Sequence, residues 1–393
     1  MKSNYRRLGD YIQELKVRNT EEKAEQLLGI NIDKFFMPSV ANVVGTDLSV
    51  YKLVRKNQFA CNRMHVGRDY RLPISMSKSD EEFMVSPAYD VFEIKDPEVL
   101  NPEFLMMWFS RSEFDRNAWF HTDGDVRGGL PWKSFCDMQI PIPNPTKQKE
   151  IVKEYNVIQN RIALNQQLIQ KLEETAQAIY KAWLVEGIDL ENLPEGWRVD
   201  KLKNLCEKIG SGSTPNGGKE SYFTTGISLI RSTNVFDYNF SFEDLAFISD
   251  EQANKLKNVE VKENDILFNI TGVSVARCCK VPKNVLPARV NQHVMIIRPN
   301  GKLNISFYLL LNLCSTDSKN TLLGISQSGS TREAITKSEL EEFLLLVPEN
   351  ELLQKFEKQL SKLFSLKDLK SLENQKLTEM KDLLLSKLAT IAN

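Results

Sequence analysis

The chain has few of the residues that build metal sites, disulfide frameworks or histidine-based active sites. Its 393 residues include six cysteines, none in a CxxC pair, and three histidines that stand far apart. Structural zinc usually takes four ligands at short paired spacings, so we expect no metal and reduced, mostly buried thiols. No apolar run is long enough to span a bilayer and no secretory signal opens the chain, which predicts a cytoplasmic protein.

Catalytic signatures are missing as well. No Asn/Asp-Pro-Pro-aromatic motif of a methyltransferase occurs. Asp80, Glu93 and Lys95 have the spacing of a nuclease set, but the internal repeat described below places Arg298 and Asn300 opposite the last two. The sequence therefore predicts a binding protein rather than an enzyme.

A glycine-rich stretch at 209–222, IGSGSTPNGGKESY, raises the question of a phosphate-binding loop. A Walker A loop needs G-x-x-x-x-G-K-[S/T] between a strand and a helix. With Gly218 and Lys219 as its GK pair, Ser213 stands where glycine is required and Glu220 where a metal-binding hydroxyl is required. The residues before the stretch also read as a helix or turn rather than a buried strand. We conclude that it is not a nucleotide site.

The sequence contains two copies of one module. Four stretches of the first half recur in the same order in the second, at offsets of 207, 205, 203 and 205 residues. We predict two modules of about 145 residues, each followed by a long helix. The matching stretches are NQFACN (57–62) with NDILFN (264–269), VSPAYDVFEI (85–94) with VNQHVMIIRP (290–299), LNPEFLMMWF (100–109) with LNISFYLLLN (303–312), and IPIP (140–143) with LLVP (345–348).

A heptad pattern follows the first module. Its apolar positions alternate in steps of four and three, which is the seam of a coiled coil. Asn144 and Pro145 suit the start of a helix, Gly187 suits its end, and Asn165 is a polar seam residue of the kind that fixes register. The predicted seam is Ile151, Tyr155, Ile158, Ile162, Asn165, Ile169, Leu172, Ala176, Ile179 and Trp183.

A second helical stretch follows the second module. Its apolar seam slips register within LKDLKSLENQK (366–376), so we expect a stutter or bend there. Both helices could pack into one globular core, but two seams, one after each module, favour pairing of the helices with each other. Their outward faces would then be free for a partner protein.

Positive charge is concentrated at matching places of a chain that is neutral overall. The whole chain has 51 basic and 52 acidic side chains, yet residues 266–316 contain six basic and no acidic ones. Residues 51–79 contain seven basic side chains against Asp69 alone. Such segments are typical of contacts with a polyanion, and neighbouring polar groups could read base edges. The alternative is that both are simply solvated faces.

Several stretches resemble the specificity (S) subunits of type I restriction-modification systems. LPEGWRVDKLKNLCEKIGSGSTP (193–215) is similar to that family's entry into a target-recognition domain, and NDILFNITG (264–272) and SGSTREAITKSELEEFLLLVP (328–348) to later motifs. Residues 147–186 resemble its central spacer helix. The first module is more divergent: DVRGGLPWKSFCDMQIPIP (125–143) fits, but the Gly-Ser-Thr-Pro loop is missing.

The resemblance implies an α+β fold in which two α/β target-recognition domains, in pseudo-twofold repeat, are joined by two long antiparallel coiled-coil helices. The recognition domains would be 1–145 and 191–347, and the spacer helices 146–190 and 348–393. The implied function is that of a non-catalytic subunit that reads a two-part target in double-stranded DNA, one half-site per domain.

The resemblance also implies partners. The helices would dock two methyltransferase (modification) subunits, which bind S-adenosylmethionine and methylate adenine, and restriction/translocase subunits would use ATP and Mg²⁺. No cofactor is expected on this chain. Two alternatives stay open: a specificity subunit of a system whose single partner both methylates and cuts, and a coiled-coil scaffold whose modules bind protein.

Candidate DNA-contacting residues follow from the repeat and the resemblance, with a surface or capping role as the alternative for each. In the first module they are Asn62, Arg63, His65, Arg68, Arg71 and Arg127. In the second they are Ser213, Thr214, Lys219, Arg231, Asn234, Asn269, Thr271, Arg277, Ser330 and Arg332. No catalytic or metal-binding residue is assigned.

Overall fold

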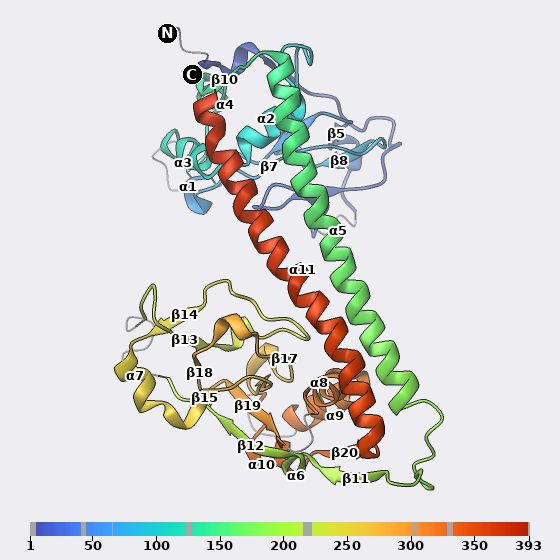
Figure 1. Ribbon diagram of the computed structural model, residues 1–393. Helices are drawn as coiled ribbons and strands as arrows, with labels where there is room; N and C mark the ends of the chain where they lie inside the picture. The colour runs from blue at the N-terminus through green and yellow to red at the C-terminus, as the bar shows by residue number, and fades with distance from the viewer. Residues whose placement is uncertain are drawn as a thin grey trace. The chain divides into compact units, whose positions relative to one another are not determined.

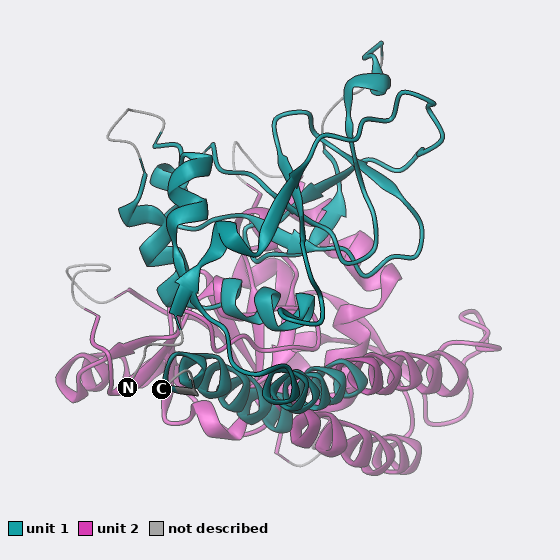
Figure 2. Ribbon diagram, turned by 90° about the horizontal axis from the view of Figure 1, so that it is seen from above, with its two compact units in different colours: residues 1–165, 372–393 teal, residues 166–371 magenta. Residues whose placement is uncertain are grey.

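The chain divides into two compact units, and both crossings between them lie inside long helices. Unit 1 comprises residues 1–165 and 372–393, and unit 2 comprises residues 166–371 (Figure 2). The crossings fall within α5 (Pro145–Leu184) and α11 (Asn350–Ile391) (Figure 1). The four-segment division expected from the sequence is finer and stays a prediction. The computed structural model describes residues 5–40, 45–64, 66–122, 128–214, 222–301, 305–327 and 333–391.

Unit 1 is built on a four-stranded antiparallel sheet. Its strand order is β2-β9-β6-β7, formed by Ile12–Leu15, Asp90–Ile94, Phe59–Cys61 and Ile74–Met76. Two-stranded pairs surround it: β1 (Tyr5–Arg7) with β10 (Gln139–Pro141), β3 (Leu28–Ile30) with β4 (Phe36–Pro38), and β5 (Lys52–Val54) with β8 (Phe83–Val85). Its short helices are α1 (Val66–Asp69), α2 (Pro102–Phe109), α3 (Ser112–Phe120) and α4 (Trp132–Asp137).

Unit 2 holds two four-stranded sheets. The first has the order β12-β19-β16-β17, formed by Cys206–Ser211, Val294–Pro299, Ile266–Asn269 and Cys278–Lys280. The second has the order β14-β13-β18-β15, formed by Ala246–Ile248, Ile227–Ile230, Ala288–Val290 and Glu260–Val261. A further pair joins β11 (Arg198–Lys201) to β20 (Leu344–Val347). The short helices are α6 (Leu202–Leu205), α7 (Asp250–Lys255), α8 (Ser306–Cys314), α9 (Thr316–Gln327) and α10 (Lys337–Glu341).

The predicted duplication is confirmed by topology. The sheet order β2-β9-β6-β7 in unit 1 is matched element for element by β12-β19-β16-β17 in unit 2. In each module the second strand of this order, β9 or β19, is followed along the chain by three short helices. The next strand, β10 or β20, pairs with the first strand of its module, β1 or β11. The long helix comes next in each case. The two halves are therefore copies of one α/β module, as the four sequence matches predicted.

The central strands of both modules are buried on both faces, which explains their continuous apolar runs. In β16, Phe268 faces the core that contains α8 and α11, whereas its neighbour Leu267 faces the core of the second sheet. In β6, Phe59 and Ala60 likewise enter two different clusters. Because side chains alternate across a strand, each central strand joins two apolar layers.

The first long helix begins and ends where the sequence indicates. The Asn144 side chain accepts a hydrogen bond from the Lys147 amide at 2.8 Å, and α5 starts at Pro145. Three residues beyond its end, Gly187 has a φ of 77°, a conformation that glycine adopts without strain. Asn165 is buried in the seam and donates to the Asn374 side-chain oxygen of α11 at 3.0 Å, so a polar pair does stand at the predicted position.

The seam expected at the C-terminal end of α5 is partly wrong. Trp183 is 40% exposed, although its ring lies 6.2 Å from that of Phe356. Tyr180 and Leu184 are buried instead. The buried positions advance in steps of four from Leu172 onward, because here the helix packs on the core of the second module as well as on α11. The heptad pattern therefore holds only where the two helices face each other.

Where the apolar seam of the last helix slips register, the structure has polar residues in the seam and no break in the helix. The helix α11 is continuous from Asn350 to Ile391. Lys367 occupies a buried position in its middle and forms an ion pair with Glu173 of α5 at 2.9 Å. Polar residues fill the seam where the apolar pattern lapses, so no bend is needed to explain the sequence.

Each long helix is also tied to its module by one buried polar side chain. In unit 1, Gln148 in the first turns of α5 donates to the carbonyls of Val99 and Pro143 and accepts from the Asn101 amide. In unit 2, the Glu357 carboxylate of α11 accepts from the amides of Phe307 and Tyr308, the orphan donors at the start of α8. These two contacts fix how each helix sits on its module.

The carboxyl of Glu357 should make the stability of unit 2 depend on pH. Burial raises its pKa from 4.5 to about 7, despite the two amide hydrogen bonds and nearby Lys280, which favour the charged form. Its stabilising contribution is therefore fully present below about pH 4.5 and is lost as the pH rises to about 7. In Glu357→Gln this loss should disappear, a difference of up to about 3 kcal/mol in unfolding free energy.

Urea unfolding of the wild type and Glu357→Gln across that pH range measures the effect. Glu351→Gln is the matched control, because Glu351 lies on the same helix with its side chain in solvent. Parallel pH profiles for the wild type and Glu357→Gln would show that the buried carboxyl does not behave as described.

Candidate nucleic-acid interface

Five loops of unit 2 converge at one edge of its two sheets. At this edge the register pairs Ser211 with Met295 and Asn269 with Val294 in the first sheet, and Ile230 with Val290 in the second. The short segment 291–293 joins the two sheets directly. The described residues that directly follow β12, β13 and β16, this segment, and residues 333–336 before α10 therefore share one edge, which we call the loop edge. Ala334, before α10, forms a bridge with Thr271 there.

A chain of polar side chains runs along the loop edge. The Thr214 hydroxyl donates to the side-chain oxygen of Gln292. The Gln292 nitrogen is 3.2 Å from Nε2 of His293, and Nδ1 of His293 is 2.8 Å from the Thr271 hydroxyl. Two predicted residues, Thr214 and Thr271, are thus brought together although 57 positions separate them. No motif in the sequence selects His293, which stands far from the other histidines; the repeat indicates only the neighbouring strand.

Two predicted asparagines hold the edge from inside. Asn234 is fully buried, accepts from the Arg231 amide and donates to the carbonyls of Ser241 and Glu243. Asn269 is also fully buried and donates to the Ser232 carbonyl at 3.0 Å. Both shape the loop that follows β13. The structure gives them the capping role that was the alternative, and direct DNA contact by either stays a prediction.

Two predicted arginines lie against aromatic rings at the same edge. The guanidinium of Arg277 is 5.2 Å from the ring centre of Phe236, and that of Arg231 is 5.8 Å from the ring centre of Tyr222. Neither makes an ion pair with an acidic side chain among the described residues. The Nε of Arg231 and the side-chain oxygen of Asn269 are buried there without a hydrogen-bond partner in the described part of the chain. Ser213 is exposed at the start of this edge.

The first module places its candidates at the equivalent edge, after β6. Asn62 accepts from the Met64 amide, and Arg63 forms a largely buried ion pair with Asp90 at 2.6 Å. Arg68 and Arg71 are exposed and pair with Asp69 and Asp33 respectively. The guanidinium of Arg63 also donates to the Leu130 carbonyl. In this structure Arg63 therefore serves the module itself, and DNA contact by Arg63 stays a prediction.

The two basic segments, residues 51–79 and 266–316, carry less net positive charge in the fold than their sequence indicates, because acidic side chains from other parts of the chain pair with them. In unit 2, Lys283 pairs with Glu263, Arg289 with Glu260, and Arg298 with Asp265, all from just before the acid-free segment. In unit 1, Arg55 pairs with Glu82 and Lys56 with Asp80. Charge counted along the sequence overstates the positive surface, because the acidic partners come from neighbouring strands.

Five candidates lie outside the described residues: His65, Arg127, Lys219, Ser330 and Arg332. One argument about the glycine-rich stretch needs correction, since β12 does precede it as a strand. That strand lies at the edge of its sheet and is mostly not buried, so its sequence lacks the apolar run of a central strand. The other two departures from a Walker A motif, Ser213 and Glu220, stand in the sequence itself.

Comparison with known proteins identifies the class of fold. Residues 194–381 match the family described as the type I restriction modification DNA specificity domain. The crystal structure of a type I restriction-modification S subunit from M. genitalium superposes with a TM-score of 0.58 at 15% identity, covering 98% of this chain and 96% of that one. None of the described helices is both long and apolar enough to cross a membrane.

Curated relatives carry the same description. The chain is 20% identical to the type I restriction enzyme HindI specificity subunit of Haemophilus influenzae over 91% of both chains. It is 24% identical to the MjaIX specificity subunit of Methanocaldococcus jannaschii over 67% of this chain and 64% of that one. The resemblance found in the sequence is therefore confirmed: this chain is similar to type I restriction-modification specificity subunits over most of its length.

The glycine that opens the loop after β12 should not tolerate a side chain. A Cβ on Gly212 would lie 1.7 Å from the Val290 carbonyl oxygen, so the loop or the strand would have to move. We expect Gly212→Ala to lower the unfolding free energy by about 3 kcal/mol, at the upper end for overpacking. Urea denaturation measures the change. Gly210→Ala is the control, because a Cβ there meets nothing nearer than 4.0 Å; equal losses in both variants would contradict the packing described.

Proposed function

We propose that the chain is the DNA sequence-specificity subunit of a type I restriction-modification complex, with one half-site of a two-part target read by each module. The observation that carries the proposal is the duplicated module with a loop edge in each copy, in a chain related to specificity subunits. Two readers joined through helices suit two separated half-sites on one duplex. The chain itself would perform no catalysis.

The loop edge of unit 2 has the chemistry that base and phosphate recognition requires. Hydroxyl, amide and imidazole groups stand side by side in the polar chain of Thr214, Gln292, His293 and Thr271. Such groups can both donate and accept hydrogen bonds, as base edges demand. Arg277 adds a cation that is not neutralised by a described carboxylate and so can meet a phosphate. The Nε of Arg231 and the side-chain oxygen of Asn269 have no hydrogen-bond partner among the described residues, so one donor and one acceptor at the loop edge are available for further hydrogen bonds.

The long helices carry exposed apolar side chains suited to partner docking. In unit 2, Leu366 and Leu369 of α11 are exposed, Leu369 by 62%. In unit 1, Val157 and Leu164 of α5 and Met380 of α11 are likewise exposed. On each helix these lie away from the buried seam, and helical apolar faces of this kind usually mark an interface. We propose that methyltransferase subunits pack on them.

The finer parts of the proposal concern partners and location. Two methyltransferase subunits would bring S-adenosylmethionine, and restriction/translocase subunits would bring ATP and Mg²⁺. The complex would work in the cytoplasm, where the target DNA lies. A partner that both methylates and cuts would leave the role of this chain unchanged, whereas a protein-binding scaffold would show no preference among DNA sequences.

Arg277 should contribute to DNA binding through its charge. In complex with the methyltransferase partner, Arg277→Gln is expected to weaken target binding about tenfold and to reduce the dependence of log K on log salt by about one. Fluorescence anisotropy over a salt series measures both. Lys283→Gln is the matched control, because Lys283 is an exposed cation paired with Glu263 away from the loop edge. Identical losses in the two variants would remove the loop edge from the binding site.

The helices should set the distance between the half-sites. Seven residues added to both α5 and α11, after positions 165 and 371, lengthen each helix by about 10 Å. We expect the recognised gap to grow by about three base pairs at 3.4 Å each, with both half-site sequences unchanged. Binding selection from a randomised DNA library gives the answer. The control is a seven-residue insertion after the exposed Leu190, beyond the end of α5; a changed gap in that control, or none in the helix variant, contradicts the proposal.

A further inference from the structure

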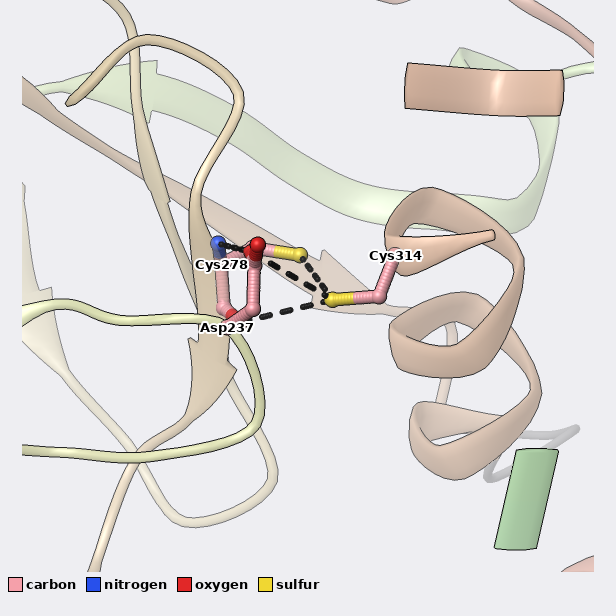
Figure 3. Close-up of side chains that lie close together, drawn as sticks. All are labelled: Asp237, Cys278 and Cys314. Carbon is pink, nitrogen blue, oxygen red and sulfur yellow. Dashed lines mark hydrogen bonds between the residues drawn. The ribbon is translucent and has the colours of Figure 1, made fainter. Parts of the chain in front are cut away.

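Two cysteines and an aspartate meet beneath the loop edge of unit 2. Cys278 is the first residue of β17, Cys314 is the last residue of α8, and Asp237 lies in the loop after β13 (Figure 3). The sequence separates them by 41 and 36 residues, which is why spacing motifs did not reveal them. Three elements that differ in type thus deliver three metal-ligating side chains to one place.

The distances are close to those of a small coordination sphere. The two sulfurs are 3.2 Å apart, and the Cys314 sulfur is 3.7 Å from Oδ1 of Asp237. All three ligand atoms lie within 4.8 Å of one another. A tetrahedral zinc ion with Zn–S bonds of about 2.3 Å holds its sulfurs about 3.8 Å apart, so the pair would need to open by only about half an ångström.

Burial and charge also fit a metal ion. Cys278 is fully buried, while the Asp237 side chain is 41% exposed and leaves a path for an ion and a fourth, water ligand. Lys319 lies 2.6 Å from Oδ1 of Asp237 and also donates to the Ala276 carbonyl. Two thiolates, one carboxylate and a divalent ion carry one net negative charge, which the Lys319 ammonium would balance after shifting from Oδ1.

We propose that Asp237, Cys278 and Cys314 form a binding site for a thiophilic divalent cation of the zinc class. Binding releases two protons: both thiols become thiolates that ligate the ion, and the carboxylate joins them without a change of charge. Burial raises the pKa of the Cys314 thiol, so this thiol stays protonated until the metal displaces its proton.

A bound ion would brace the loop edge. Asp237 accepts from the Cys278 amide, and its neighbours Tyr238 and Asn239 contact Lys367 and Glu173 of the helix pair. A metal there would link the loop after β13, strand β17 and helix α8. Binding to the folded state alone would stabilise unit 2 by an amount that grows with the logarithm of the metal concentration once this exceeds the dissociation constant. The site does not depend on the proposed DNA function.

Cobalt binding to the purified full chain tests the site directly. Co²⁺ added to reduced, metal-free protein should give one equivalent of tightly bound metal, with a thiolate-to-cobalt charge-transfer band and tetrahedral d–d bands, and Zn²⁺ should displace it. Cys278→Ser and Cys314→Ser should lose the charge-transfer band. Asp237→Asn should weaken binding at least about tenfold, since even outer-sphere changes cost that much.

Cys279→Ala is the matched control. Cys279 is adjacent in β17 but faces the core of the second sheet, so its removal should leave the cobalt spectrum unchanged. The wild-type titration does not depend on the folding of any variant. Absence of a thiolate–cobalt band in the wild type would overturn the proposal. A band that survives in both cysteine variants would also overturn it. The same holds if the two thiols form a disulfide and the protein does not bind metal.

Discussion

The structure depends on the burial of one face of each long helix against the module that precedes it in the chain. In unit 2, Phe356, Leu360 and Phe364 of α11 share a single core with α8, the first sheet and α5. The Glu357 carboxylate, in the same helical turn, caps α8. A helix held both by apolar contact and by a buried hydrogen-bonded carboxyl group has one position on its module. The loop edge is therefore also held in one position on unit 2, since its loops are anchored on the same sheet and on the same pair of helices.

Much of this architecture could be predicted from the sequence because its signals are periodic. The duplicated module, the start of α5 at Asn144 and the polar pair at Asn165 are local or repeated patterns, and the structure has all three. The assignment of Trp183 to the seam is wrong because periodicity cannot tell whether a helix faces another helix or the core of a module. The strand before the glycine-rich loop was missed because an edge strand lacks an apolar run. These misses share a cause: burial is decided by partners that are distant in the chain.

The candidate site was harder to predict for the same reason. The repeat and the resemblance selected Thr214, Thr271 and Arg277, which the structure places at the loop edge, but they did not distinguish residues that build the edge, such as Asn234 and Asn269, from those that face outward. Charge counts indicated that whole segments are positive. In the fold, ion pairs with Glu260, Glu263 and Asp265 neutralise much of the positive charge of residues 266–316. His293 and the cluster of Asp237, Cys278 and Cys314 carry no sequence signal, because contacts between residues distant in the chain bring their members together.

The central claim is that two similar modules on one chain read two different half-sites at a fixed separation. Mapping of every methylated adenine in the genome of a cell that carries this chain with its methyltransferase partner tests it most directly. The account predicts a single asymmetric motif made of two specified parts separated by an unspecified gap of constant length, and loss of all its methylation when this chain is deleted. A continuous undivided motif, or methylation that persists without the chain, would contradict it.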